Sequence, residues 1–112
     1  MKHAETKRLR NRGFVPLLSS RSSQAATMTL RPGAESSESS SNEHGWAEQW
    51  LYVVSGSGVA RFGRRRVALR EGSLVLIARR EPHVIHNTGR TNLVTINVYV
   101  PPAYDADGEP LR

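Results

Sequence analysis

The chain has 112 residues, of which 38% are hydrophobic and none is cysteine, and its formal net charge is +6. A chain of this length closes one hydrophobic core, and the lack of cysteine excludes disulfides, thiolate metal sites and a cysteine nucleophile. No apolar run approaches the roughly 20 residues of a transmembrane helix, and no apolar segment follows the basic start MKHAETKRLR as a secretory signal requires. We therefore expect one cytoplasmic domain without a membrane partner.

Short apolar runs alternate with turn residues from Gly13 onward, at intervals of about eight to twelve residues. This spacing is typical of antiparallel sandwiches and barrels, so the sequence predicts an all-β fold. Residues 3–11 are basic and permit a short helix before the first strand. The candidate strands, in chain order, are 14–20, 25–32, 48–56, 58–63, 65–70, 73–78, 83–87 and 92–100.

Three segments can be distinguished within the single domain. Residues 1–23 form an N-terminal arm with the first strand, residues 24–102 form the barrel and residues 103–112 form a C-terminal tail. The barrel segment contains the serine- and glutamate-rich stretch AESSESSSNEHG, which lacks the apolar residues to order itself by burial. We interpret this stretch as a loop at the mouth of the barrel, acting either as a lid or as a simple surface connection.

Histidines are the strongest candidates for chemistry, and there are only four of them. His44 and His83 stand near the beginnings of predicted strands, and together with Gln49 they converge if those strands are neighbours in a barrel. His86 is expected on the opposite face of its strand, and His3 lies in a terminus that is expected to fray. Imidazole nitrogens combined with amide oxygens suit Fe, Mn, Ni, Cu or Zn.

The stretch GSLVLIARREPHVIHN resembles the second motif of small single-domain cupins. That motif runs glycine, five residues, Pro-x-Gly, two residues, histidine, three residues and asparagine. Gly72, His83 and Asn87 match it, whereas Ala78 and Arg80 replace the usual proline and glycine.

The stretch NEHGWAEQWLYVVSG is similar to the first cupin motif. That motif runs glycine, five residues, His-x-His, three or four residues, glutamate, six residues and glycine. Asn42 takes the place of the first histidine, His44 that of the second and Gln49 that of the glutamate, and Gly56 closes the motif. Gly33 matches the opening glycine, but eight residues rather than five separate it from Asn42.

The resemblance covers roughly residues 24 to 102 and implies a jelly-roll barrel that usually holds a divalent metal ion with three histidines and a glutamate. It implies a site made of His44, Gln49 and His83 here, with Asn42 or water completing the coordination. Since all these ligands are neutral, a bound divalent metal ion would keep its full charge and favour an anionic group such as a carboxylate or enolate.

Two arginines, Arg79 and Arg80, precede His83 in the loop that leads to it. They strengthen the attraction for an anion if they turn toward the barrel mouth, and otherwise form a solvated turn. The carboxylates nearest to the site are Glu43 and Glu48, and neither is assigned a catalytic role.

The register of the strand 48–56 decides which side chain enters the barrel. Neighbours in a strand alternate, so either Glu48 or Gln49 faces inward but not both. The six residues between Gln49 and Gly56 match the motif and favour Gln49. The site is therefore predicted to be neutral.

This register places Trp50, Tyr52 and Val54 on the outer face of the strand. An apolar stripe with two large aromatic residues is rarely left in water on a monomer of this size. Two explanations remain: the N-terminal stretch FVPLL covers the stripe, or a second copy of the chain does. The second explanation predicts a homodimer, which the cupin resemblance also implies.

Two functions of different classes follow. In the first, a metal-bound cupin acts on a small anionic or oxygen-rich molecule by dioxygenation, isomerisation or decarboxylation. In the second, a metal-free barrel binds a small molecule through hydrogen bonds from the same side chains. Nucleic-acid binding is disfavoured because the arginines do not interleave with aromatic residues on one face.

Trp46 either lines the pocket entrance or packs as a loop aromatic.

Overall fold

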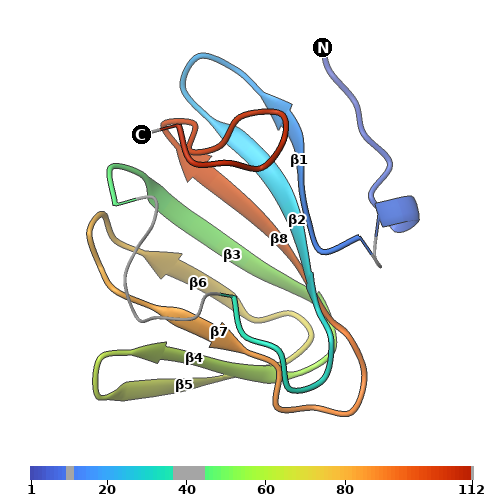
Figure 1. Ribbon diagram of the computed structural model, residues 1–112, viewed down its shortest axis with the longest axis vertical. Coiled ribbons are helices and arrows are strands. Elements are labelled where there is room, and N and C mark those ends of the chain that lie inside the picture. The colour runs from blue at the N-terminus through green and yellow to red at the C-terminus, as the bar shows by residue number, and fades with distance from the viewer. Residues whose placement is uncertain (10–11, 37–44, 112) are drawn as a thin grey trace.

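Two antiparallel sheets that face each other make up the protein, as the computed structural model shows (Figure 1). The model describes residues 1–9, 12–36 and 45–111. In the described part, a single 3-10 turn (η1, Lys7–Leu9) lies within the predicted N-terminal helix, and no described helix is long and apolar enough to cross a membrane. The prediction of an all-β antiparallel fold is confirmed.

The larger sheet has five strands and the smaller sheet has three. The strand order is β1-β2-β8-β3-β6 in the larger sheet and β5-β4-β7 in the smaller one. The strands are β1 (Phe14–Ser19), β2 (Gln24–Leu30), β3 (Glu48–Ser55), β4 (Gly58–Phe62), β5 (Arg65–Leu69), β6 (Leu74–Ile77), β7 (Val84–His86) and β8 (Leu93–Val100).

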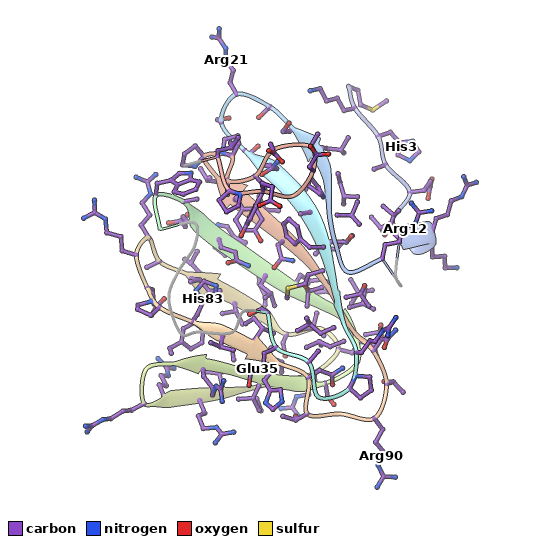
Figure 2. All side chains as sticks on the ribbon, in the orientation of Figure 1. His3, Arg12, Arg21, Glu35, His83 and Arg90 are labelled. Carbon is purple, nitrogen blue, oxygen red and sulfur yellow. The ribbon has the colours of Figure 1, made fainter. Side chains whose placement is uncertain are left out.

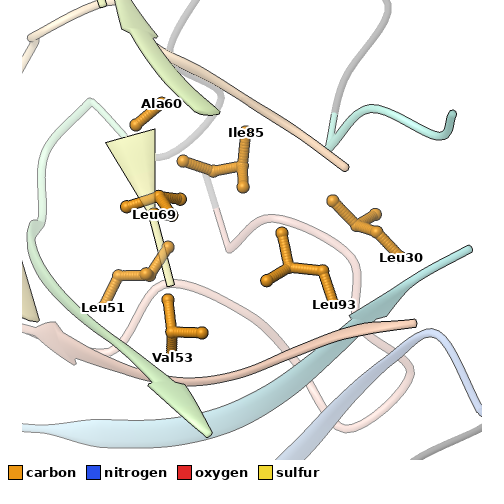
Figure 3. Close-up of a cluster of buried hydrophobic side chains, with 7 residues drawn as sticks. All are labelled: Leu30, Leu51, Val53, Ala60, Leu69, Ile85 and Leu93. Carbon is orange, nitrogen blue, oxygen red and sulfur yellow. The ribbon is translucent and has the colours of Figure 1, made fainter. Parts of the chain in front are cut away.

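The main hydrophobic core lies between the two sheets (Figure 3). Both sheets contribute because successive side chains of a strand point to opposite faces, so each strand sends every second residue inward. Burial of one large aliphatic side chain stabilises the fold by about 1.5–3 kcal/mol. The buried members of this cluster are Leu30, Leu51, Val53, Ala60, Leu69, Ile85 and Leu93.

The register of β3 agrees with the predicted one. Gln49, Leu51 and Val53 are 3%, 0% and 0% exposed, whereas Trp50 and Tyr52 are 40% and 45% exposed. Gln49 therefore faces the interior, and the alternative in which Glu48 does so is wrong.

Asn87, which matches the asparagine of the cupin motif, has a structural role. Its side chain is fully buried, and Nδ2 donates hydrogen bonds to the carbonyl oxygens of Leu30 (2.8 Å) and Thr91 (2.9 Å). Its Oδ1 accepts a hydrogen bond from the backbone N–H of Gly89 (2.9 Å). Asn87 thus satisfies three backbone groups where β7 leads into the connection to β8, and those groups would otherwise be left without partners.

The predicted C-terminal tail is anchored by its first two residues. Ala103 and Tyr104 are buried, and their backbone N–H groups donate to Oε1 of Gln24 at 3.1 and 3.0 Å. Nε2 of Gln24 donates in turn to the carbonyl oxygen of Tyr104 (2.8 Å). The side chain of Gln24 thereby ties the start of the tail to the first residue of β2.

The outer face of the larger sheet carries an exposed apolar patch, which we define as Trp50, Tyr52, Leu74 and Leu76. These side chains are 40%, 45%, 62% and 48% exposed. Trp50 lies opposite Leu76, and Tyr52 lies opposite Leu74, in the pairing of β3 with β6. The stretch FVPLL does not cover the patch, since β1 lies at the opposite edge of this sheet from β6.

We expect a second copy of the chain to cover the apolar patch. The patch contains no charged side chain, so two molecules of net charge +6 can meet there without bringing like charges into contact. A stable interface buries about 800 Å² from each partner, so the contact must extend beyond these four side chains. Light scattering should give twice the chain mass of 12.4 kDa at micromolar concentration.

The double substitution Trp50→Glu/Leu76→Glu should give a folded monomer, because it places charge in the middle of the apolar patch. Leu111→Glu is the matched control, since Leu111 is 51% exposed but lies outside the patch. A monomeric mass for the unmodified protein would contradict the expected dimer.

Candidate functional site

The predicted site residues that the structure describes lie at one end of the barrel. Figure 1 shows that β3 begins, β6 ends and β7 begins at this end. Gln49, near the start of β3, pairs with Ile77, the last residue of β6. A turn then leads to His83 at the entry of β7, and the backbone N–H of Arg80 in this turn donates to the carbonyl oxygen of Gly45 (2.9 Å).

A chain of buried hydrogen bonds crosses the larger sheet at this end, from β3 through β8 to β2. Oγ1 of Thr95 donates to the carbonyl oxygen of Met28 (3.3 Å). Nδ2 of Asn97 donates to Oγ1 of Thr95 (3.0 Å), and Nε2 of Gln49 donates to Oδ1 of Asn97 (2.8 Å). Gln49, Thr95 and Asn97 are all buried, so these bonds form in a medium that excludes most water.

The direction of this chain of hydrogen bonds is set at its Thr95 end. A backbone carbonyl accepts only, so the single hydroxyl hydrogen of Thr95 goes to Met28, and the oxygen of Thr95 accepts from Asn97. Asn97 must then present its amide nitrogen to Thr95 and its oxygen to Gln49. Gln49 must therefore direct its amide nitrogen at the oxygen of Asn97, so its own oxygen points away from Asn97.

The side-chain oxygen of Gln49 differs from the other polar atoms of this chain of hydrogen bonds. Oε1 is buried, and it makes no hydrogen bond to any of the described residues. A buried acceptor without a donor costs about 1–3 kcal/mol. A cation or a donor group that reached this oxygen would recover that cost.

His83 is buried (8% exposed) and has a fixed ring orientation at the same end of the barrel (Figure 2). Its Nδ1 lies 3.0 Å from the carbonyl oxygen of Glu81. Because a carbonyl cannot donate, Nδ1 carries the hydrogen, and in the neutral ring Nε2 offers a lone pair. Histidines that bind metal ions are commonly held in this way, by a hydrogen bond from their other ring nitrogen.

Two of the four predicted metal ligands can be placed. Gln49 and His83 are buried at the same end of the barrel, whereas His44 and Asn42 lie outside the described residues, as does Glu43. Within residues 1–9, 12–36 and 45–111, no group of three or more His, Cys, Asp or Glu side chains is placed to hold a metal ion. The complete ligand set therefore remains a prediction.

Asn97 belongs to the site but is absent from the sequence-based set. The sequence does indicate an inward position for Asn97, because Leu93, Thr95, Asn97 and Tyr99 occupy alternate positions in NLVTINVYV. All four are buried, so they form the inward face of β8. An amide at such an inward position requires a buried hydrogen-bond partner, and Gln49 is one of them.

Trp46 packs beside the site as a loop aromatic, the second of its two predicted roles. Its Nε1 donates to the carbonyl oxygen of Pro102 (3.1 Å), and its ring lies against a cluster that includes Tyr99 and Tyr104. The rings of Tyr99 and Tyr104 meet edge to face, with centroids 5.1 Å apart. Aromatic packing therefore stabilises the loop that precedes β3.

Arg80 occupies the position of the motif glycine and adopts a conformation that glycine favours. Its φ is +63°, and Arg80 is the one non-glycine residue with positive φ in the described part of the chain. The turn is held by Glu81, whose Oε1 accepts from the backbone N–H of Ala78 (3.0 Å). Side chains with a Cβ pay about 1–2 kcal/mol for this conformation.

Comparisons with known proteins bear on the same segment. The sequence model of the cupin domain family matches residues 26–99 of this chain, which is more than half of its length. The chain belongs to the cupin family. The matched range includes Gln49, Gly56, Gly72, His83 and Asn87. Among curated proteins, none matches this sequence.

Solved structures confirm the cupin fold. BH2720 from Bacillus halodurans is 23% identical with a TM-score of 0.78, and the match covers 86% of this chain and 76% of that one. TT1209 from Thermus thermophilus is 22% identical with a TM-score of 0.77, covering 90% and 98%. A predicted oxalate decarboxylase from Thermotoga maritima is 26% identical with a TM-score of 0.69, covering 80% and 79%.

Arg80→Gly should increase the free energy of unfolding by about 1 kcal/mol, because glycine adopts a positive φ without the steric cost of a Cβ. Urea unfolding followed by circular dichroism measures this change. Arg79→Gly is the matched control, since Arg79 is also exposed but has no positive φ, and it should not stabilise the protein. A loss of stability in Arg80→Gly would contradict the proposed origin of the strain.

Proposed function

We propose that this cupin binds a divalent metal ion at the end of the barrel marked by Gln49 and His83 and presents it to a small anionic or oxygen-rich molecule. His44 would be the third protein ligand, and Asn42 or water would complete the coordination. The observation that carries the proposal is the buried Oε1 of Gln49, which has no hydrogen-bond partner among the described residues.

The orientation of the Gln49 amide supports this role. Its nitrogen donates to Asn97, so its oxygen is the atom left for a ligand. Amide oxygens are suitable ligands for hard and borderline divalent cations. A site built in this way needs no movement of Gln49 on binding, because the hydrogen bond from Nε2 already holds the side chain.

His83 supports the proposal through its tautomer. With Nδ1 bound to the Glu81 carbonyl, Nε2 is the ring nitrogen that would coordinate a metal ion. The neutral imidazole is the form that binds metal, and this tautomer directs its lone pair away from the Glu81 carbonyl. Glu81 therefore acts as a positioning residue through its backbone.

The donor set fits a metal ion but contributes no negative charge. A bound divalent cation would supply Lewis-acid activation of an oxygen atom on the substrate. The protein would contribute neutral ligands at a buried position, so that the cation's charge remains available to an anion. Dioxygenation, isomerisation and decarboxylation are the reaction types that suit such a site.

A small carboxylate is the preferred substrate class. The similar structure from Thermotoga maritima is described as a predicted oxalate decarboxylase, and oxalate is a small dianion. Arg79 and Arg80 are exposed in the turn that leads to His83 and add positive charge near this end of the barrel. Both features favour an anion over a neutral sugar or a cation.

A metal-free binding barrel is the second candidate. It is favoured by the replacement of the motif glutamate with Gln49, which removes the one charged ligand of the usual set. In this function, Oε1 of Gln49 would accept a hydrogen bond from the bound molecule. A rise in melting temperature on addition of small hydroxy acids, whose hydroxyl groups can donate to Oε1, in the presence of a chelator would identify it.

Elemental analysis of the tag-free protein, before and after reconstitution, tests the metal site. We expect about one divalent metal ion per chain in the unmodified protein and its loss in His83→Ala. His86→Ala is the matched control, because His86 pairs with Val59 at the edge of the smaller sheet and is only half-buried, and this variant should keep the metal.

Gln49→Glu should change metal affinity in the opposite direction to His83→Ala. It restores the charged ligand of the motif, so metal affinity should rise, on the order of tenfold or more. Absence of metal from all of these proteins after reconstitution would refute the metal site and leave the binding barrel.

A further inference from the structure

A cavity lies outside the barrel interior. It has a volume of about 420 Å³ and is lined by Arg12, Gly13, Thr29, Arg31 and Asn92. These residues come from the segment before β1, the end of β2 and the connection that leads into β8. Figure 2 shows Arg12 on the outer side of the larger sheet, away from His83.

The position of Thr29 shows that this cavity is separate from the proposed metal site. Met28 and Leu30, its neighbours in β2, pack into the core between the sheets. Since side chains alternate along a strand, Thr29 points to the opposite face. The backbone N–H of Thr29 donates to the carbonyl oxygen of Gly13 (2.9 Å), so Gly13 continues the pairing of β1 with β2 beside the cavity.

The described lining of the cavity is positively charged. Arg12 and Arg31 are both exposed, and neither makes a salt bridge to an acidic residue within the described ranges. Among the described residues, no aspartate or glutamate lines the cavity. Two guanidinium groups in one concave site, with no carboxylate, favour an anion.

Thr29 provides an independent observation at the same place. Thr29 is 8% exposed, and its Oγ1 is buried without a hydrogen-bond partner among the residues of the described structure. A hydroxyl group in such a position normally finds an acceptor or a donor. An oxygen atom of a bound anion at the floor of the cavity would supply the acceptor.

We propose that this cavity is a second binding site, which takes a small molecule that bears a phosphate or carboxylate group. Its volume lies within the range of about 300–1,000 Å³ typical of small-molecule pockets, so it holds more than a single phosphate ion. Arg12 and Arg31 would form charge-assisted hydrogen bonds to the anionic group, and Thr29 would donate its hydroxyl hydrogen.

A small molecule fits this site better than a nucleic acid does. A nucleic acid needs a row of basic side chains along its backbone and, when single-stranded, aromatic rings on which its bases stack. The described lining contains two arginines and no aromatic residue. The site is therefore local rather than a track across the surface.

Titration of isotopically labelled protein with inorganic phosphate, citrate and AMP, followed by NMR at constant ionic strength, tests the proposal. We expect saturable shifts of the backbone amides of Gly13, Thr29 and Asn92, with at least one probe binding in the millimolar range or tighter. Arg12→Gln and Arg31→Gln should each weaken that binding about tenfold, since each removes a charge-assisted hydrogen bond to the anionic group.

Two further variants separate binding at the cavity from general effects. Arg21→Gln removes the same charge from the exposed β1–β2 connection and should leave the affinity unchanged. Thr29→Val should weaken binding several-fold without lowering the melting temperature, because it removes a buried hydroxyl that has no partner in the described structure. The bound metal content should not change in any of these variants, so failure of this site and failure of the metal site are distinguishable.

Three results would overturn the proposal. The first is the absence of saturable shifts with all three probes at about 20 mM, well above the expected range of dissociation constants. The second is an equal loss of affinity in Arg21→Gln and Arg12→Gln, which would indicate attraction by the overall charge. The third is preferential binding of a single-stranded oligonucleotide that falls steeply with salt, which would assign the basic surface to nucleic acid.

Discussion

A chain of hydrogen bonds determines how the buried amide groups of the barrel interior are oriented. It runs from Gln49 through Asn97 and Thr95 to the backbone of Met28. These bonds join the three central strands of the larger sheet by side chains as well as by backbone pairing. Because each of these side chains donates to the next, the direction of the whole set follows from the single carbonyl at its end. The consequence is an amide oxygen that is buried, oriented and unpartnered by any described group.

This polar set lies beside an apolar core, and the two features depend on the same alternation of side chains. On β3, Gln49 shares its face with Leu51 and Val53, which fill the space between the sheets. A shift of one residue would bury Glu48 and move the aliphatic residues to the surface. Packing of the core thus fixes the register, and the register places Gln49 in the interior at the end where His83 enters.

The same alternation explains the two outer features of the larger sheet. Trp50 and Leu76 become exposed because their neighbours in sequence are needed in the core. Thr29 lines the outer cavity beside Arg12 and Gly13 because Met28 and Leu30 face inward. One face of the sheet therefore offers an apolar surface and a basic cavity, while the other encloses the proposed metal site.

Much of this arrangement could be predicted from the sequence. The apolar runs and turn residues indicated eight strands, and the motif spacing indicated the inward position of Gln49, because both depend on short-range periodicity. The cavity at Arg12 and Arg31 could not be predicted, because it joins segments that become neighbours only through the pairing of β2 with β1 and β8. The hydrogen bond from Gln49 to Asn97 depends on strand order in the same way, and the strained φ of Arg80 depends on the course of the turn.

Neutron diffraction from crystals of the deuterated protein is the sharpest test of the oriented amide, because it distinguishes the nitrogen of Gln49 from its oxygen. We predict that Nε2 carries two deuterium atoms with one directed at Oδ1 of Asn97, and that Oε1 contacts a metal ion, a water molecule or a bound donor. The reverse orientation, with the oxygen of Gln49 toward Asn97 and the nitrogen facing the site, would contradict the proposed role of Gln49 as a ligand.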